Sequence, residues 1–176
     1  NLIREYNPSF LKKDGSNITT KLTFEINLGL GSSSTLISNL SKLSGVNPYI
    51  LNNKIFKGSG YDIACAENIS PILYKLNKDQ KIINEVSFKP SFHELIYFVY
   101  LNKKQNSFSE IERYNKNKAS NSIINEISNI TSEILACNSI DVFNKLIEAH
   151  ELIISKLISK QTIKDVLFDD FDGSIK

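Results

Sequence analysis

The sequence has no methionine and no tryptophan, and it has only two cysteines and two histidines among its 176 residues. Cys65 and Cys137 lie far apart and show none of the paired spacings of zinc sites, and two cysteines are too few for a disulfide-rich scaffold. This low content favours a reducing compartment, in which we expect both thiols to be buried and inert. His93 and His150 are isolated as well, so no histidine is placed to activate a cysteine nucleophile.

The sequence also lacks a strong charge of either sign and a long apolar run. Its 21 basic and 19 acidic residues give a net charge of +2 without a basic stripe, which argues against nucleic-acid binding. No apolar run approaches the roughly 18 residues of a membrane-spanning helix, and no signal segment opens the chain. With 41% hydrophobic residues the chain can bury a core. Composition therefore predicts a folded, soluble, intracellular protein.

Two common phosphate-binding signatures, G-x-x-x-x-G-K-[ST] and G-x-G-x-x-G, are absent, but another glycine loop is present. Alternating apolar residues predict a strand from Leu22 to Ile26, and helical spacing predicts a helix from Thr35 to Leu43 that Gly45 closes. Backbone N–H groups at the start of such a helix bind anions, and glycine lets a ligand come close. The order predicts a phosphate cradle, with a tight turn and a good N-cap as the alternative. The loop residues are Gly29, Leu30, Gly31, Ser32, Ser33 and Ser34.

A second glycine motif follows about thirty residues later and carries an acid. Asn47 and Pro48 predict the N-cap and first position of a short helix that ends at Lys57, and the motif Gly58-Ser59-Gly60-Tyr61-Asp62 comes next. A carboxylate on a glycine-flanked turn beside a phosphate cradle can orient a substrate hydroxyl or accept its proton during phosphoryl transfer. Asp62 is therefore the candidate catalytic residue.

Together the two motifs resemble those of the GHMP kinase family, which includes galactokinase, homoserine kinase, mevalonate kinase and phosphomevalonate kinase. Gly29 to Ser33 looks like the second motif of that family. Gly58 to Ala64 resembles the G-S-G-x-D-x-A form of its phosphomevalonate-kinase-like branch and of a bacterial group known by the letters GYDIA. Tyr97 to Ser107 looks like the strand and loop that open the second domain of the family.

The resemblance implies a cytoplasmic enzyme that uses ATP and Mg²⁺ and acts on a small molecule, with no nucleic-acid or membrane partner. By residue-to-residue match, Asp62 is the catalytic acid, Ser33 is a magnesium or phosphate ligand, and the amides of Gly29 to Ser34 hold the triphosphate. Ser107 is a candidate for substrate phosphate, although N-capping of a helix also accounts for it. The implied substrate-binding residues are Gly58, Ser59, Gly60 and Ser107.

Three departures from the family pattern stand out. Family members begin with a lysine-bearing strand segment and end with a third glycine-rich motif, and neither occurs between Asn1 and Lys176. We therefore expect an interior fragment that is inactive and prone to association when expressed as it stands. In addition, no acid occurs from Thr35 to Lys57, where several family members carry a magnesium-binding glutamate.

The rest of the chain predicts scaffold. Residues 72–76 and 82–88 read as strands joined by a turn, and Leu95 to Leu101 reads as a central strand. A capping box at 107–110 begins one helix, and two apolar stripes predict two more. Because strands and helices segregate along the chain, we predict the α+β class, with helices packed on a mixed or antiparallel sheet. The stripes are Ile123, Ile127, Ile130 and Ile134, then Phe143, Leu146, Ile147, Ile153 and Leu157.

The two-domain fold of the GHMP family is of this α+β kind, and here we expect it to be incomplete at both ends. The expected parts are residues 1–80, from the nucleotide-binding domain, and residues 81–176, from the second domain, with a break between Asn77 and Pro90.

The sequence thus leads to an ATP-dependent kinase that phosphorylates a small-molecule hydroxyl or phosphate. Mevalonate or phosphomevalonate is the leading acceptor, on the branch resemblance alone. A mevalonate-diphosphate-decarboxylase-like enzyme, a non-catalytic nucleotide- or metabolite-binding relative and a pure interaction module stay open. The two glycine motifs are the features on which the kinase hypothesis depends.

Overall fold

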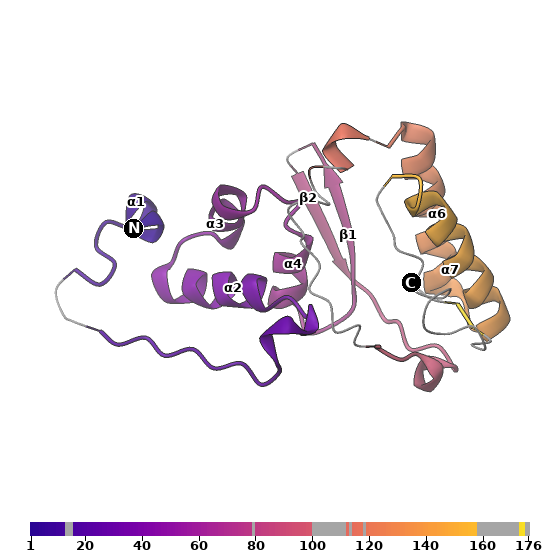
Figure 1. Cartoon of the computed structure of the whole chain (residues 1–176), viewed down its shortest axis with the longest axis horizontal. Coiled ribbons are helices and arrows are strands. Elements are labelled where there is room, and N and C mark those ends of the chain that lie inside the picture. Colours follow the sequence, from indigo (N-terminus) through magenta and orange to yellow (C-terminus); the bar gives the residue numbers. More distant parts are fainter. Residues whose placement is uncertain are drawn as a thin grey trace. The chain divides into compact units, whose positions relative to one another are not determined.

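The computed structural model describes residues 1–12, 16–78, 80–99, 112, 114–117, 119–157 and 173–174. These residues divide into two compact units (Figure 1). The first runs from Asn1 to Ser87, and the second contains Phe88 to Val99 and the described residues from 112 onward. The division after Ser87 lies within the segment from Asn77 to Pro90 in which a break was expected.

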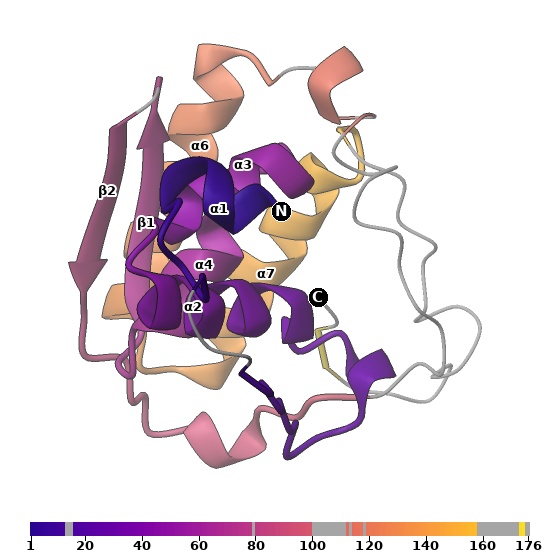
Figure 2. The same ribbon diagram turned by 90° about the vertical axis from the view of Figure 1, so that its left-hand side faces the viewer.

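The first unit combines helices with a two-stranded antiparallel sheet, which confirms the α+β class. Figure 2 shows the strand pair as one layer beside the helices of this unit. The sheet contacts the helices chiefly through strand β1, which packs on helix α4. The elements are α1 (Leu2–Tyr6), the 3₁₀ helix η1 (Ile26–Leu28), α2 (Ser32–Ser44), α3 (Pro48–Ile55), α4 (Tyr61–Glu67), β1 (Ile72–Asn77) and β2 (Gln80–Glu85).

Local capping signals set the C-terminal end of α2 and the N-terminal end of α3 as predicted, whereas α3 ends at Ile55 and not at Lys57. Gly45 ends α2 with a left-handed backbone, φ +69°, and its N–H donates to the carbonyl of Ser41. The side chain of Asn47 accepts a hydrogen bond of 2.9 Å from the N–H of Tyr49, and Pro48 occupies the first helical position. Helix α2 begins at Ser32, before the predicted start, so the serine triplet belongs to its first turn.

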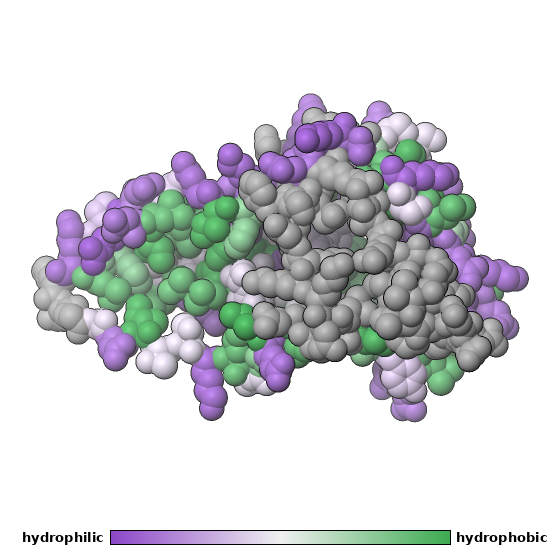
Figure 3. Space-filling model, in the orientation of Figure 1, coloured by the Kyte–Doolittle hydropathy of each residue, from purple (hydrophilic) through white to green (hydrophobic). Residues whose placement is uncertain are grey.

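The core of the first unit is built around the contact between α2 and α4. Ile63 and Ala64 of α4 are completely buried, and Ile37 of α2 packs in the same cluster as Ile63. The inward face of α2 is otherwise made of small serines, which allow the neighbouring helices to approach closely. Half-buried side chains of α1 and α3 pack on the cluster, and Figure 3 shows apolar residues gathered over α1, α2 and α3. The buried serines of α2 are Ser34, Ser38, Ser41 and Ser44.

The predicted strand from Leu22 to Ile26 is wrong. Residues 22–25 form no strand, and Ile26 begins the 3₁₀ helix η1 with 63% of its surface exposed. A strand is stabilised by hydrogen bonds to a neighbouring strand, and in the described residues β1 and β2 pair only with each other. Alternating apolar residues therefore do not suffice to make a strand here.

The predicted strand pair is confirmed as the hairpin β1–β2, although the second strand covers Gln80–Glu85 and residues 86–88 form no strand. Its register pairs Asn77 with Gln80, which leaves a two-residue turn in which Lys78 has φ +54°. Residues opposite each other in an antiparallel pair point to the same face, so Tyr74 and its partner Ile83 share one face. Both are half-buried, and this is the face that packs on the helices.

The second unit is built on two helices, α6 (Asn121–Ala136) and α7 (Ile140–Ile154), joined by a short connection. Both predicted apolar stripes are confirmed, because α6 and α7 pack together with Ile130 and Ile147 buried. Phe92 lies against Phe143 of α7, with 5.0 Å between ring centroids. Neither these helices nor any other in the described part of the chain is long and apolar enough to cross a membrane.

Two further predictions are wrong for described residues. The described part of the proposed central strand, residues 95–99, contains no strand, and Phe98 is 95% exposed. Like the first predicted strand, this apolar run has no strand beside it among the described residues. Cys65, expected to be buried, is exposed, because α4 turns Ile63 and Ala64 inward instead. Ser107 and the capping box at 107–110 lie outside the described residues.

The buried contact between α4 and α2 yields a stability prediction. We expect Ile63→Ala to lower the free energy of unfolding by about 2–5 kcal/mol, because it leaves a cavity at a completely buried position. Ile69→Ala is the matched control, since Ile69 is fully exposed, and it should change stability by less than about 0.5 kcal/mol. Urea unfolding followed by circular dichroism measures both, and equal effects would contradict this core.

Candidate functional site

The loop before α2 has the backbone conformation that its glycines permit. Gly29 and Gly31 both adopt the left-handed region, with φ +74° and +73°, which residues with a Cβ rarely adopt. Apart from the glycine itself and the residues next to it in the chain, no heavy atom of the described residues lies within 4 Å of the place where a Cβ of either glycine would be. The loop is therefore open on that side, and a ligand can reach the backbone.

The first turn of α2 leaves backbone donors free. No side chain of the described residues caps this helix, and its first hydrogen bond at this end runs from Thr35 N–H to the carbonyl of Gly31, at 3.0 Å. The N–H groups of Ser32, Ser33 and Ser34 have no acceptor among the described residues. Because α2 has 13 residues, its dipole adds partial positive charge at this end. These donors can hold an anion such as a phosphate.

The three serine hydroxyls of this turn are not equivalent. Ser33 is exposed, Ser32 is half-buried and Ser34 is buried with 7% of its surface accessible. Only the hydroxyl of Ser33 is thus freely available to a ligand or a metal ion, while Ser34 can contribute its backbone N–H. Leu30, the remaining residue of the predicted cradle, is 53% exposed.

The second glycine motif forms the N-terminal end of α4. Gly60 is the N-cap residue, with φ +84°, and Asp62 lies in the first helical turn. Asp62 is exposed and makes no hydrogen bond or ion pair with another described residue. Its carboxylate is thus available to a substrate, as the prediction for a catalytic acid requires. Gly58 and Ser59 lie in the preceding loop, and Ser107 lies outside the described residues.

The structure places both motifs in the first unit, at the N-terminal ends of two helices that pack together (Figure 1). The hydroxyl of Ser38 in α2 donates to a carboxylate oxygen of Glu67 in α4, at 3.4 Å. Ile37 of α2 and the completely buried Ile63 of α4 belong to one apolar cluster at the same interface. Packing of α2 on α4 therefore determines how the predicted cradle and the predicted acid are placed relative to each other.

A cluster of tyrosines surrounds the Gly58–Asp62 motif, and the sequence analysis missed it. The hydroxyl of Tyr74 donates a hydrogen bond of 2.5 Å to the carbonyl of Ser59, and its ring meets Tyr61 edge-on with 5.6 Å between centroids. A Cβ on Gly60 would lie 2.8 Å from the ring of Tyr49. The Nζ atom of Lys81 lies 4.8 Å from the centre of that ring.

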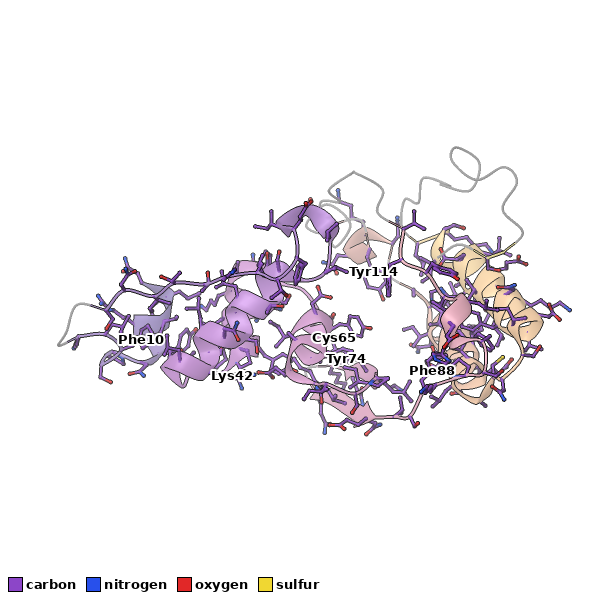
Figure 4. All side chains as sticks on the ribbon, turned by 90° about the horizontal axis from the view of Figure 1, so that it is seen from below. Phe10, Lys42, Cys65, Tyr74, Phe88 and Tyr114 are labelled. Carbon is purple, nitrogen blue, oxygen red and sulfur yellow. The ribbon has the colours of Figure 1, made fainter. Side chains whose placement is uncertain are left out.

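The environment of the cluster keeps its phenols protonated. A hydrogen bond with Cys65, and after it burial, raise the pKa of Tyr61 to about 12. Burial first, and then the charge of Glu67, raise the pKa of Tyr49, and burial raises the pKa of Tyr74. Figure 4 shows Cys65 of α4 and Tyr74 of β1 on this part of the first unit. At neutral pH the hydroxyl of Tyr74 therefore keeps the proton that it donates to Ser59.

The described residues offer no protein cage for a metal ion. No group of three or more histidine, cysteine, aspartate or glutamate side chains among them could hold one. Ser33 is an exposed residue of the loop whose hydroxyl could supply one oxygen ligand to such an ion.

Comparison of the chain with protein-family models, with curated proteins and with solved structures finds no match in any of the three.

The contact between Gly60 and Tyr49 yields a prediction that separates steric clash from backbone strain. We expect Gly31→Ala to lower the free energy of unfolding by about 1–2 kcal/mol, the cost of a left-handed backbone with a Cβ in open space. Gly60→Ala should lower it by about 1–3 kcal/mol more, because the methyl group also meets the Tyr49 ring. Urea unfolding measures the difference, and equal losses would show that the ring moves away.

Proposed function

We propose that the protein is an ATP-dependent small-molecule kinase of the GHMP type. The observation that carries the proposal is the N-terminal turn of α2, which no side chain of the described residues caps and which follows two left-handed glycines with no described neighbour beside them. A loop of this geometry presents backbone donors to an anion at close range. The resemblance of both motifs to the GHMP pattern supports ATP as the source of that anion.

In the proposed reaction the backbone of Gly29 to Ser34 holds the phosphates, and Mg²⁺ enters with the nucleotide. The amides and the ion offset the charge of the transferred phosphoryl group, which passes through a loose transition state. The hydroxyl of Ser33 is positioned in the first turn to bind a phosphate oxygen or the ion. Gly58, Ser59 and Gly60 would line the acceptor side, since they lead directly into the acid-bearing helix.

Asp62 orients the acceptor hydroxyl and accepts its proton. Its side chain is exposed in the first turn of α4, and α4 packs on the helix that bears the phosphate loop. With the hydroxyl held in line with the phosphoryl group, little further chemistry is required of the protein. Mevalonate or phosphomevalonate is the acceptor that the branch resemblance favours. The same resemblance favours a cytoplasmic enzyme with the two-domain fold of the GHMP family.

A non-catalytic nucleotide-binding relative is the second candidate. It is favoured by the fact that, in the described residues, Asp62 stands without a metal-binding acid cluster. Both candidates require the phosphate loop, and only the kinase requires the carboxylate. Two experiments therefore test the loop and the acid separately.

For the loop, we expect Gly31→Val to abolish nucleotide binding while the protein still folds. A branched side chain would occupy the space beside the loop and resist the left-handed backbone of Gly31. Calorimetric titration with Mg-ATP measures the binding, and circular dichroism checks the fold.

The matched control is Gly45→Val, at the other end of α2. Gly45 has φ +69° and the same open surroundings, so both variants carry similar backbone strain. We expect the control to bind Mg-ATP like the unchanged protein. If the folded Gly31→Val variant binds Mg-ATP with unchanged affinity, the loop is only a tight turn and not a phosphate site.

For the acid, we expect Asp62→Asn in the full-length protein to lower kcat by about two to four orders of magnitude. Nucleotide affinity should stay within a few-fold, because the phosphates are held by α2 and not by this side chain. Steady-state kinetics with mevalonate and phosphomevalonate, beside a separate nucleotide titration, measure both. Glu85→Gln, at an exposed carboxylate at the end of β2, is the control and should leave kcat unchanged.

Turnover of Asp62→Asn at the rate of the unchanged enzyme would remove Asp62 from the mechanism. Binding of Mg-ATP without turnover of any acceptor in the unchanged protein would favour the non-catalytic relative.

A further inference from the structure

We propose that Tyr74 is a positioning residue for Asp62, and that Tyr49 and Lys81 complete a clamp on the loop between Gly58 and Tyr61. The inference deepens the proposed kinase function and rests on it. Tyr74 belongs to β1, Lys81 to β2 and Tyr49 to α3, so three elements outside the motif hold the segment that leads to Asp62.

The first contact of the clamp is made by Tyr74. Its hydroxyl donates to the carbonyl of Ser59 at 2.5 Å, which is a short hydrogen bond. Its ring meets the ring of Tyr61 at 76° between planes, a favourable edge-on arrangement. The side chain of Tyr74 thus contacts both neighbours of Gly60, Ser59 and Tyr61.

The second contact is made by Tyr49, which packs directly on Gly60. The space beside the Cα atom of Gly60 is filled by this ring, since a Cβ there would lie 2.8 Å from ring carbon Cδ1. Lys81 lies on the same site, with its Cε atom 3.4 Å from that Cβ position and its Nζ atom 4.8 Å from the ring centre. A cation near an aromatic face is attracted to it, so Lys81 helps to hold the ring in place.

The hairpin register explains why two of these side chains arrive together. Tyr74 pairs with Ile83 and Leu76 pairs with Lys81, so Tyr74 and Lys81 lie on the same face of the hairpin, two pairs apart in the register. This face packs on α4, the helix that begins at Tyr61. The hairpin therefore supports the start of that helix.

The loop needs such support because its own residues restrict its backbone conformation very little. Gly58 and Gly60 have the greatest backbone freedom of any residue type, and α4 has only seven residues, too few to be stable alone. Asp62 follows Gly60 by two residues, so a rotation in the loop would move its carboxylate. A misplacement of about 1 Å can lower a rate about 100-fold. The hydroxyl of Tyr74 is already used by Ser59, which makes its role positional and not chemical.

Tyr74→Phe tests the clamp because it removes the hydroxyl and keeps the ring. In the full-length protein we expect kcat to fall about tenfold, the equivalent of one lost hydrogen bond, with nucleotide affinity unchanged. Tyr6→Phe is the matched control, because Tyr6 is exposed on α1 in the same unit, and it should leave kcat unchanged. If Tyr74 acts through Asp62, adding Tyr74→Phe to the Asp62→Asn variant should cause no further fall in kcat.

Amide hydrogen exchange gives a readout that does not depend on catalysis. Ala64 N–H donates to the carbonyl of Gly60, and Tyr61 N–H donates to the hydroxyl of Ser59, so both amides report on the loop. We expect both to exchange several-fold faster in Tyr74→Phe and at the original rate in Tyr6→Phe. Unchanged exchange would overturn the clamp, and so would a full further loss of kcat in the Asp62→Asn background. If the unchanged protein has no kinase activity, the proposed function fails, and exchange alone decides whether the clamp exists.

Discussion

Packing of α2 against α4 is the contact on which the candidate site depends. Ile63 and Ala64 of α4 are completely buried, and Ser38 of α2 is 2% exposed beside them. Small side chains on the facing surface of α2 let the two helices come close, and the hydrogen bond from Ser38 to Glu67 adds a polar contact. Each helix carries one glycine motif at its N-terminal end, so this interface links the phosphate loop to the acid.

Signals that act within a few residues of the chain were predicted well. The glycine end of α2, the cap of α3 by Asn47 and the hairpin turn after Asn77 each depend on neighbours in the sequence, and all three are present. The predictions of the apolar stripes of α6 and α7 succeeded for the same reason, because helical periodicity is local. The strand predictions at 22–26 and 95–99 failed because a strand depends on a partner strand that can come from anywhere in the chain.

In the candidate site, too, the features that depend on neighbouring residues could be predicted, and those that depend on distant residues could not. The left-handed glycines and the open first turn of α2 follow from residues 29–34 alone, so the sequence could predict them. The tyrosine cluster could not be predicted, because it joins Tyr49, Tyr74 and Lys81 from three elements around one glycine. The one signal available was the alternation in the hairpin, which puts Tyr74 and Lys81 on a common face once the register is known.

The two motifs also differ in how their geometry is maintained. The proposed phosphate loop leads into a helix of 13 residues whose own backbone would supply the anion donors, so the proposed binding needs few contacts from elsewhere. The acid lies on a helix of seven residues after a loop with two glycines, and such a segment has no fixed conformation of its own. Its order must come from Ile63 and Ala64 on one side and from Tyr49 and Tyr74 on the other. The proposed anion binding thus depends on local backbone, whereas placement of the Asp62 carboxylate depends on tertiary packing.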